Sequence, residues 1–244
     1  RIAVTAKKRA AAAGLLAAVT MLGGCSEMEQ LIGGQTAWTP QESDAVSIAA
    51  DGSVTEIVQD TLDESYYDVS ELESMINSEI TEYNSEHGED TIQIDSFENE
   101  GTAVTLKLWY SSAEDYAEFN NAEFFSGSII GAQIEGYLFD TSFYQVEDGV
   151  ADDTALGSSR VFQDMSLQVV IVQAPMEVHV EEGTVIYIST NAEMISSDTV
   201  NANGEQEDEG EVLVLPSSKV YEGEEVSYEE EKLANRVYIL YDME

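Results

Sequence analysis

The chain has 244 residues, of which 49 are acidic and nine are lysine or arginine, so its formal net charge at pH 7 is −40. Because phosphate groups are bound by clusters of lysine and arginine, this composition excludes nucleic acid as a partner. The single cysteine, Cys25, excludes a disulfide within the chain, so the fold must be stabilised by burial of apolar side chains.

The first 24 residues have the parts of a secretory signal. The basic cluster Lys7-Lys8-Arg9 precedes an apolar run, 10–22, and two glycines follow that run. A run of about 13 residues is shorter than the ~20 that a membrane-spanning helix needs. The pattern therefore predicts a cleaved signal peptide over residues 1–24 and not a membrane span.

Residues Leu22-Gly23-Gly24-Cys25 resemble the lipobox of bacterial lipoproteins. The resemblance implies that Cys25 becomes the first mature residue and carries diacylglycerol on its sulfur. The lipid would hold the protein at the extracytoplasmic face of the cell membrane, because each buried methylene of an acyl chain adds about 0.8 kcal/mol. The small and polar residues 25–44 are expected to form a flexible tether.

A hairpin and a helix are predicted next in the chain. Asp51-Gly52 lies between two short apolar runs, which is typical of a β-hairpin. Asp68, followed three residues later by Glu71, indicates a capping box at the start of a helix, and Gly88 is expected to end that helix. The helix has one apolar stripe, formed by Val69, Leu72, Ile76, Ile80 and Tyr83.

A second hairpin and a second helix follow. Alternating apolar residues predict strands at 92–94 and 104–110, with a turn at 98–101 between them. Ser112, with Asp115 three residues later, predicts the start of the second helix. The apolar residues of that helix are expected to be Tyr116, Phe119, Ala122 and Phe125.

This order of elements predicts the fold class α+β, with an antiparallel sheet packed on two helices over residues 45–150. The stretch 147–159 is rich in aspartate, glycine, serine and alanine and marks the expected boundary. The region 160–244 is expected to be β-rich, and it forms either a small domain of its own or extra strands on the first sheet.

Short apolar runs between turn residues define the elements of the β-rich region. Gly183 is interpreted as the turn of another hairpin, and the acidic segments 205–211 and 222–231 are expected to be loops. Strands are predicted at 167–172, 176–180, 184–189, 212–215 and 237–241.

One block of the chain extends the resemblance to lipoproteins. Residues 110–120 read Tyr-Ser-Ser-Ala-Glu-Asp-Tyr-Ala-Glu-Phe-Asn and lead into Phe124-Phe125-Ser126-Gly127. With the lipobox, tether, hairpin and helix before it, this order is similar to that of uncharacterised lipoproteins of anaerobic Gram-positive bacteria. The resemblance covers most of the mature chain and implies an extracytoplasmic location and an α+β architecture, but no activity.

The two histidines leave few ligands for a transition metal, whereas the acidic residues offer many oxygen ligands for calcium. His87 continues the apolar stripe of the first helix, where its charge would complement the C-terminal dipole, and His179 alternates with valines and is expected to face solvent. The nearest match to an EF-hand loop, 199–204, lacks the first aspartate, and Gly210 stands where the bidentate glutamate belongs. No metal site and no cofactor are predicted.

The function of the acidic surface has two interpretations. It is either a solvated surface that keeps a secreted protein soluble or a set of weak binding sites for divalent cations.

No catalytic motif is present. The chain lacks Gly-x-Ser-x-Gly, a Ser-His-Asp set and a phosphate-binding loop. Paired carboxylates of the glycosidase type remain an alternative, although 49 acidic residues allow no particular pair to be chosen. The chain is therefore expected not to be an enzyme.

Ten aromatic residues lie between Trp109 and Tyr144. They form either a core around the second helix or a groove that binds a sugar or a peptide. Trp109 shares its strand face with Thr105 and Lys107, so it either packs under a helix or is displayed. The candidate ligand-binding residues are Trp109, Tyr110, Phe124 and Phe125.

These features predict a lipid-anchored lipoprotein that serves as a non-catalytic binding or scaffold module of the cell envelope. Its partner would be an envelope protein, a peptide or a glycan. The alternatives are an envelope hydrolase that uses paired carboxylates and a surface protein stabilised by cations.

Overall fold

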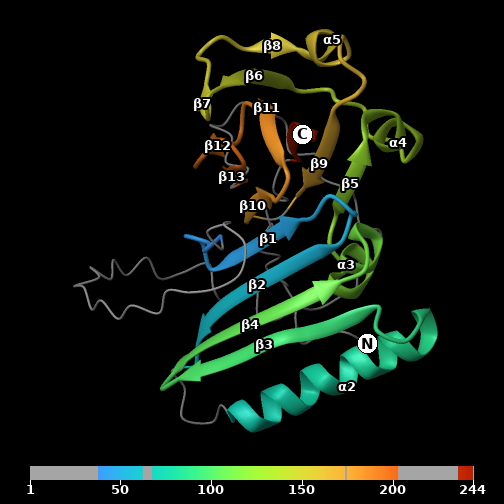
Figure 1. Ribbon diagram of the computed structural model, residues 1–244, viewed down its shortest axis with the longest axis vertical. Coiled ribbons are helices and arrows are strands. Elements are labelled where there is room, and N and C mark those ends of the chain that lie inside the picture. Colours follow the sequence, from blue (N-terminus) through green and yellow to red (C-terminus); the bar gives the residue numbers. More distant parts are fainter. Residues whose placement is uncertain (1–37, 63–67, 174, 203–235, 244) are drawn as a thin grey trace, which may run out of the picture. The chain divides into compact units, whose positions relative to one another are not determined.

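The computed structural model describes residues 38–62, 68–173, 175–202 and 236–243 (Figure 1). The chain divides into residues 1–40 and residues 41–244, and all elements below belong to the second unit. The predicted signal peptide, Cys25, the strand expected at 212–215 and both acidic segments lie outside the described residues.

The hairpin around Asp51-Gly52 is confirmed. Strands β1 (Asp44–Ile48) and β2 (Val54–Thr61) pair antiparallel on either side of it. The Asp51 carboxylate accepts hydrogen bonds from the Ser53 N–H at 2.9 Å and the Ser53 hydroxyl at 2.7 Å. Gly52 has a φ of +87°, which glycine adopts without a steric penalty, so local chemistry explains this turn.

Sheet A joins this hairpin to strands from the C-terminal part of the chain (Figure 1). Its strand order is β12-β13-β10-β1-β2-β4-β3. β1 and β10 pair in parallel, and the other pairs of this sheet are antiparallel. The further strands are β3 (Ile92–Glu100), β4 (Ala103–Tyr110), β10 (Glu177–Val180), β12 (Glu193–Met194) and β13 (Thr199–Asn201).

The turn between β3 and β4 is tighter than predicted. β3 continues to Glu100, which pairs with Ala103, so the chain turns at Gly101-Thr102 and the prediction of a turn over 98–101 was wrong. Glu98 and Asn99 remain in the strand because their backbones pair with β4, and Gly101 takes the positive φ of +69° that the turn requires.

Sheet B is antiparallel throughout and has the order β5-β9-β14-β11-β6-β7, with β8 paired to β6. Each of the two sheets therefore contains strands from before residue 152 and strands from after residue 167. The strands of sheet B are β5 (Phe124–Ser128), β6 (Ser142–Glu147), β7 (Val150–Ala151), β8 (Leu156–Gly157), β9 (Gln168–Val172), β11 (Gly183–Ser189) and β14 (Val237–Met243).

Both predicted helix starts are confirmed. The Asp68 carboxylate caps α2 (Val69–His87) by accepting from the N–H groups of Ser70 and Glu71. The Ser112 hydroxyl caps α3 (Ala113–Asn120) by accepting from the Asp115 N–H at 3.1 Å. Two short helices, α4 (Ile129–Ile134) and α5 (Ser158–Val161), pack against sheet B. The described part is thus an α+β fold with two mostly antiparallel sheets.

The second helix ends earlier than predicted. Asn121 has a left-handed φ of +46°, and its N–H returns to the carbonyls of Ala117 and Glu118, which terminates α3. Phe125 consequently lies in β5 opposite Ile171 and not on the helix, so its helical assignment was wrong. Pairing with β9 decides its conformation, which the helical spacing could not show.

The predicted hairpin at Gly183 was also wrong. β10 pairs within sheet A whereas β11 pairs within sheet B, so the chain crosses between the sheets at this point. Gly183 is needed for a different reason. A Cβ at this position would lie 2.8 Å from Tyr241 Cδ2 and 3.0 Å from the Asp242 carbonyl oxygen, so only glycine allows this approach.

Both faces of sheet B are buried, whereas sheet A has one apolar face. One core cluster combines residues of both sheets, such as Val46 and Ile48 of sheet A with Val170 and Ile239 of sheet B. The opposite face of sheet B packs on α4 and α5 around Phe139. This double burial explains why β9 and β14 are continuous apolar runs without alternation.

Gly183→Ala is expected to destabilise the protein by about 1–3 kcal/mol, because the added methyl group overpacks the contact with Tyr241. The measurement is the free energy of unfolding in urea. Gly157→Ala is the matched control, since a Cβ there has no neighbour within 4 Å and should change stability little. Equal effects of the two substitutions would contradict the assigned packing.

Candidate functional site

Two of the four candidate aromatics are core residues. Tyr110 is fully buried and Phe124 is 6% exposed, and both belong to the cluster shared by the two sheets. Tyr116 lies between them, with ring centroids 5.2 Å from Tyr110 and 4.6 Å from Phe124. These rings therefore stabilise the contact between α3, β4 and β5.

Trp109 and Phe125 lie elsewhere, so the four candidates do not share one surface. Trp109 points to the face of sheet A opposite Tyr110 and is half-buried. Phe125 packs on the second core, with its ring 5.5 Å from that of Tyr137. α2 and α3 place side chains such as Ile80 and Tyr116 against the Tyr110 face, so Trp109 is not packed under either helix.

A carboxylate is buried in the same core. Glu56 is 4% exposed and shares the apolar face of β2 with Val54 and Val58, because alternate residues of a strand point to the same side. The Tyr110 hydroxyl donates to Glu56 Oε2 at 2.5 Å, and Asn120 Nδ2 donates to the Tyr110 oxygen at 3.1 Å. In the sequence, Glu56 stands at a position of the alternating strand where an apolar residue is expected. This was the signal that could have revealed its burial.

The Tyr110 hydroxyl remains protonated in this environment. Burial, and then the negative charge of Glu56, raise the pKa of Tyr110 well above its usual value. The hydroxyl therefore acts as a hydrogen-bond donor that partly compensates the cost of burying the Glu56 carboxylate. This arrangement is structural, since both groups are enclosed by the core.

The other buried carboxylate, Glu177, lies on the opposite face of sheet A. It aligns with Ala45 and Ile57, whereas Glu56 aligns with Val46. Glu177 Oε2 accepts hydrogen bonds from the N–H groups of Gln41 and Glu42, at 2.7 and 3.2 Å. Glycosidase chemistry requires two carboxylates that face each other across a cleft. The two buried carboxylates of the described residues, Glu56 and Glu177, do not have this arrangement.

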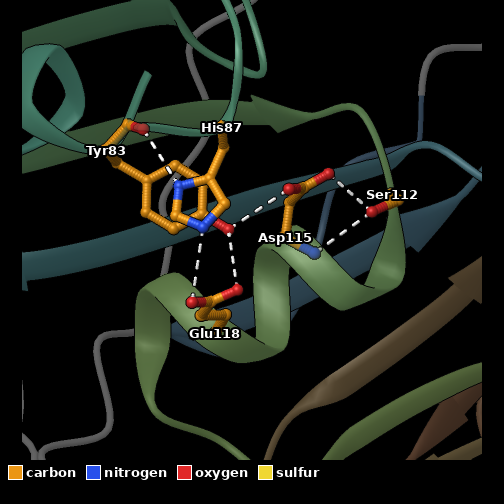
Figure 2. A network of polar contacts seen from close by, with 5 residues as sticks. All are labelled: Tyr83, His87, Ser112, Asp115 and Glu118. Atoms are coloured by element: carbon orange, nitrogen blue, oxygen red, sulfur yellow. Dashed lines mark hydrogen bonds and ion pairs between the residues drawn. The ribbon is translucent and has the colours of Figure 1, made fainter. Parts of the chain in front are cut away.

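A polar network joins α2 to α3 (Figure 2). His87 stacks on Tyr83, with ring centroids 3.9 Å apart. Figure 2 shows both side chains pointing toward the carboxylates of α3. His87 Nε2 lies 3.4 Å from Glu118 Oε1, and the Tyr83 hydroxyl donates to Asp115 Oδ1 at 3.2 Å. Asp115 also accepts a hydrogen bond from the Ser112 hydroxyl at 2.5 Å. The network aligns the two helices.

Protonation strengthens the contacts of His87. Its Nδ1 lies 3.0 Å from the Tyr83 carbonyl oxygen, which accepts a hydrogen bond from protonated Nδ1. This hydrogen bond, together with the negative charge of Glu118, raises the pKa of His87 above its ordinary value. The predicted position of His87 at the C-terminus of a helix is confirmed, and the structure adds its contact with α3.

His179 does not face solvent, so that prediction was wrong. Its side chain is 12% exposed, and Nδ1 lies 3.1 Å from Thr199 Oγ1 and 3.7 Å from Asp198 Oδ1. Burial lowers the pKa of His179 in spite of the nearby Asp198 charge. Alternation correctly identified the outer face of β10, but it could not show that Thr199 and Asp198 contact His179 there.

The most exposed apolar side chains near α4 form a surface that the sequence analysis did not identify. This α4 surface consists of Ile130, Ile134 and Leu138, which are 54%, 78% and 74% exposed. Ile130 and Ile134 are one helical turn apart, while Ile129 and Ala132 point into the second core. The stretch 124–139 has one acidic residue, Glu135, and this low charge was the available signal.

In comparisons with known proteins, no family model, no curated protein and no solved structure matches this chain. In residues 38–62, 68–173, 175–202 and 236–243, no helix is both long and apolar enough to cross a membrane. The same part of the chain places no group of three or more histidine, cysteine, aspartate or glutamate side chains where they could hold a metal ion.

The two histidines are expected to titrate on opposite sides of the ordinary imidazole pKa of about 6.5. His87 should titrate above it, so its stabilising contribution is present below pH ~6.5 and is lost as pH rises through its folded pKa. His179 should titrate below it, so its contribution is present above pH ~6.5 and is lost as pH falls.

The measurement is the pH dependence of the imidazole proton resonances by NMR, with His87→Asn used to assign the two signals. A higher midpoint for His179 than for His87 would contradict the contacts described above. Urea unfolding provides a second readout, because His87→Asn should reduce stability more at pH 5 than at pH 8.

Proposed function

We propose that this protein is a lipoprotein anchored through Cys25 at the extracytoplasmic face of the cell membrane. The support for this location is the basic cluster, the apolar run and the Gly23-Gly24-Cys25 ending of the signal. Acylation of Cys25 would remove the one thiol of the chain from redox chemistry. The module that follows would then act outside the membrane.

We further propose that the module binds an envelope partner without catalysis. The observation that carries this role is the Trp109 face of sheet A, which we define by Thr55, Ile57, Gln93, Lys107 and Trp109. Trp109 pairs with Thr55 on β2 and with Gln93 on β3, so an aromatic ring lies between two hydrogen-bonding side chains. Next to it, Lys107 forms an ion pair with Asp95 at 2.8 Å.

This combination suits recognition of an extended peptide or a glycan. A half-buried indole offers a flat apolar surface and an N–H donor at low entropic cost, and neighbouring polar side chains provide orientation. Helices α2 and α3 pack on the other face of the sheet, so this face can be approached without displacing them. The hydrolase alternative has no comparable support, since Glu56 and Glu177 lie on opposite faces.

Anchorage is tested by substituting the lipidated residue. Cys25→Ser is expected to reduce incorporation of labelled fatty acid to background and to release the protein from the membrane fraction, because the acyl chains supply the anchor. Ser26→Ala is the control, and it should incorporate as much labelled fatty acid as the natural chain does. The measurement is metabolic labelling with mass spectrometry of the mature N-terminus. A natural chain that stays unlabelled would contradict the proposal.

Binding is tested at Trp109. Trp109→Ala should weaken binding at least tenfold, about 1.4 kcal/mol, whereas Trp109→Phe should retain most of it because an aromatic face remains. The probes are purified envelope glycan stripped of protein, measured by sedimentation, and in-cell crosslinking from a photoreactive residue at position 93. If neither probe distinguishes Trp109→Ala from the natural chain, the Trp109 face is not a binding surface.

A further inference from the structure

We infer that the α4 surface, formed by Ile130, Ile134 and Leu138, is a membrane-contact site that rests on the bilayer in which the protein is anchored. This inference depends on the proposed acylation of Cys25. Its basis is the exposure of three large aliphatic side chains, 54%, 78% and 74%, within nine residues of chain. Such side chains enter the boundary between headgroups and acyl chains, where they lose contact with water.

The charge close to the α4 surface is low for this chain, which a bilayer contact requires. Acidic residues make up 49 of 244 positions in the chain, but Glu135 is the one acidic residue in the stretch 124–139. Glu123, just before this stretch, is paired with Arg236, whose guanidinium lies 5.3 Å from the centre of the Tyr137 ring. Asp140 follows the stretch, so the chain around the α4 surface is less acidic than the sequence as a whole but is not free of negative charge.

A lipid surface fits this pattern better than a second copy of the chain. Contact with a second copy depends on protein concentration, whereas the proposed lipid anchor keeps every molecule beside a bilayer. Charges farther away than about 8 Å are largely screened at physiological ionic strength, so the charge of the remaining chain strongly opposes neither contact. Tyr137 and Arg236 also have an apolar body with a polar end, as side chains at membrane interfaces commonly do.

The length of chain after Cys25 permits this contact. Residues 25–40 can span at most about 55 Å when fully extended, so the described unit cannot move far from the membrane. A tether of this length produces a high effective concentration of the α4 surface at the bilayer. Three side chains that would bind a membrane weakly by themselves can then maintain an orientation of the anchored module.

Sheet B supplies an internal reference for the contact. α4 directly follows β5 at one edge of this sheet, and β7 lies at the opposite edge (Figure 1). Val150 in β7 is 69% exposed and is therefore similar to Ile134 in exposure and chemistry. Five strand spacings separate the two edges by about 24 Å. Contact through α4 thus predicts that position 134 meets lipid while position 150 remains in water.

The experiment uses the acylated protein in vesicles of phosphatidylcholine and brominated phosphatidylcholine. Because acylated Cys25 cannot react with a thiol reagent, Ile134→Cys and Val150→Cys each provide a single site for an environment-sensitive fluorophore. The label at position 134 is expected to show a blue-shifted emission and severalfold stronger quenching by brominated lipid than the label at 150. Adding Ile130→Ser and Leu138→Ser should reduce the quenching at 134.

Equal quenching at the two positions would overturn the membrane contact. A blue shift at position 134 without quenching by brominated lipid would also overturn it, because a protein partner or a second copy would then cover the surface. Two labels per chain would show that Cys25 is not acylated and would contradict the proposed function instead. In that case, Cys25→Ser is added so that the label at position 134 is again the single one, and its quenching by added vesicles decides whether the α4 surface contacts lipid.

Discussion

The parallel pairing of β1 with β10 is the interaction on which the rest of the fold depends. Ala45 to Ile48 lie beside Glu177 to Val180, more than a hundred residues later in the chain. Glu181 then donates its N–H to the Ile48 carbonyl at 2.9 Å, and the chain crosses from sheet A into sheet B. This connection allows the two sheets to share one core, and such distant contacts make folding slow compared with a helical protein.

A buried polar network helps to define how α3 packs on that core. Asn120 Nδ2 lies 3.1 Å from both the Tyr110 hydroxyl oxygen and the Tyr116 carbonyl oxygen, and Tyr110 donates to Glu56. A carboxylate in an apolar core is costly unless it accepts hydrogen bonds, so alternative packings of α3 are disfavoured. The same strand positions that bury Tyr110 turn Trp109 to the opposite face, which connects core packing with the proposed binding surface.

The two proposed surfaces are consistent with one anchored molecule. The Trp109 face belongs to sheet A, and the α4 surface adjoins the edge strand β5 of sheet B, so one module can contact lipid and bind a partner at the same time. The formal charge of −40 opposes association with other acidic surfaces through like-charge repulsion. Anchorage and orientation together would determine which envelope molecules can reach Trp109.

The sequence by itself determined the elements that depend on short-range interactions. The Asp51-Gly52 hairpin and the caps at Asp68 and Ser112 were predictable because each is made by hydrogen bonds or backbone conformations within a few residues. It also placed Trp109 and Tyr110 on opposite strand faces. The low charge of the stretch 124–139 was a signal for the α4 surface, but helical spacing alone does not show which of its apolar residues remain uncovered.

Only the tertiary structure decided the features that depend on distant strands. Phe125 became a strand residue because β9 pairs with it, and Gly183 proved to be a close contact with Tyr241 in the crossing between sheets. Burial of His179 likewise depends on its neighbours across sheet A. The physical reason is the same in each case. The sequence around a residue indicates its local conformation, but the packing of remote segments determines which groups it contacts.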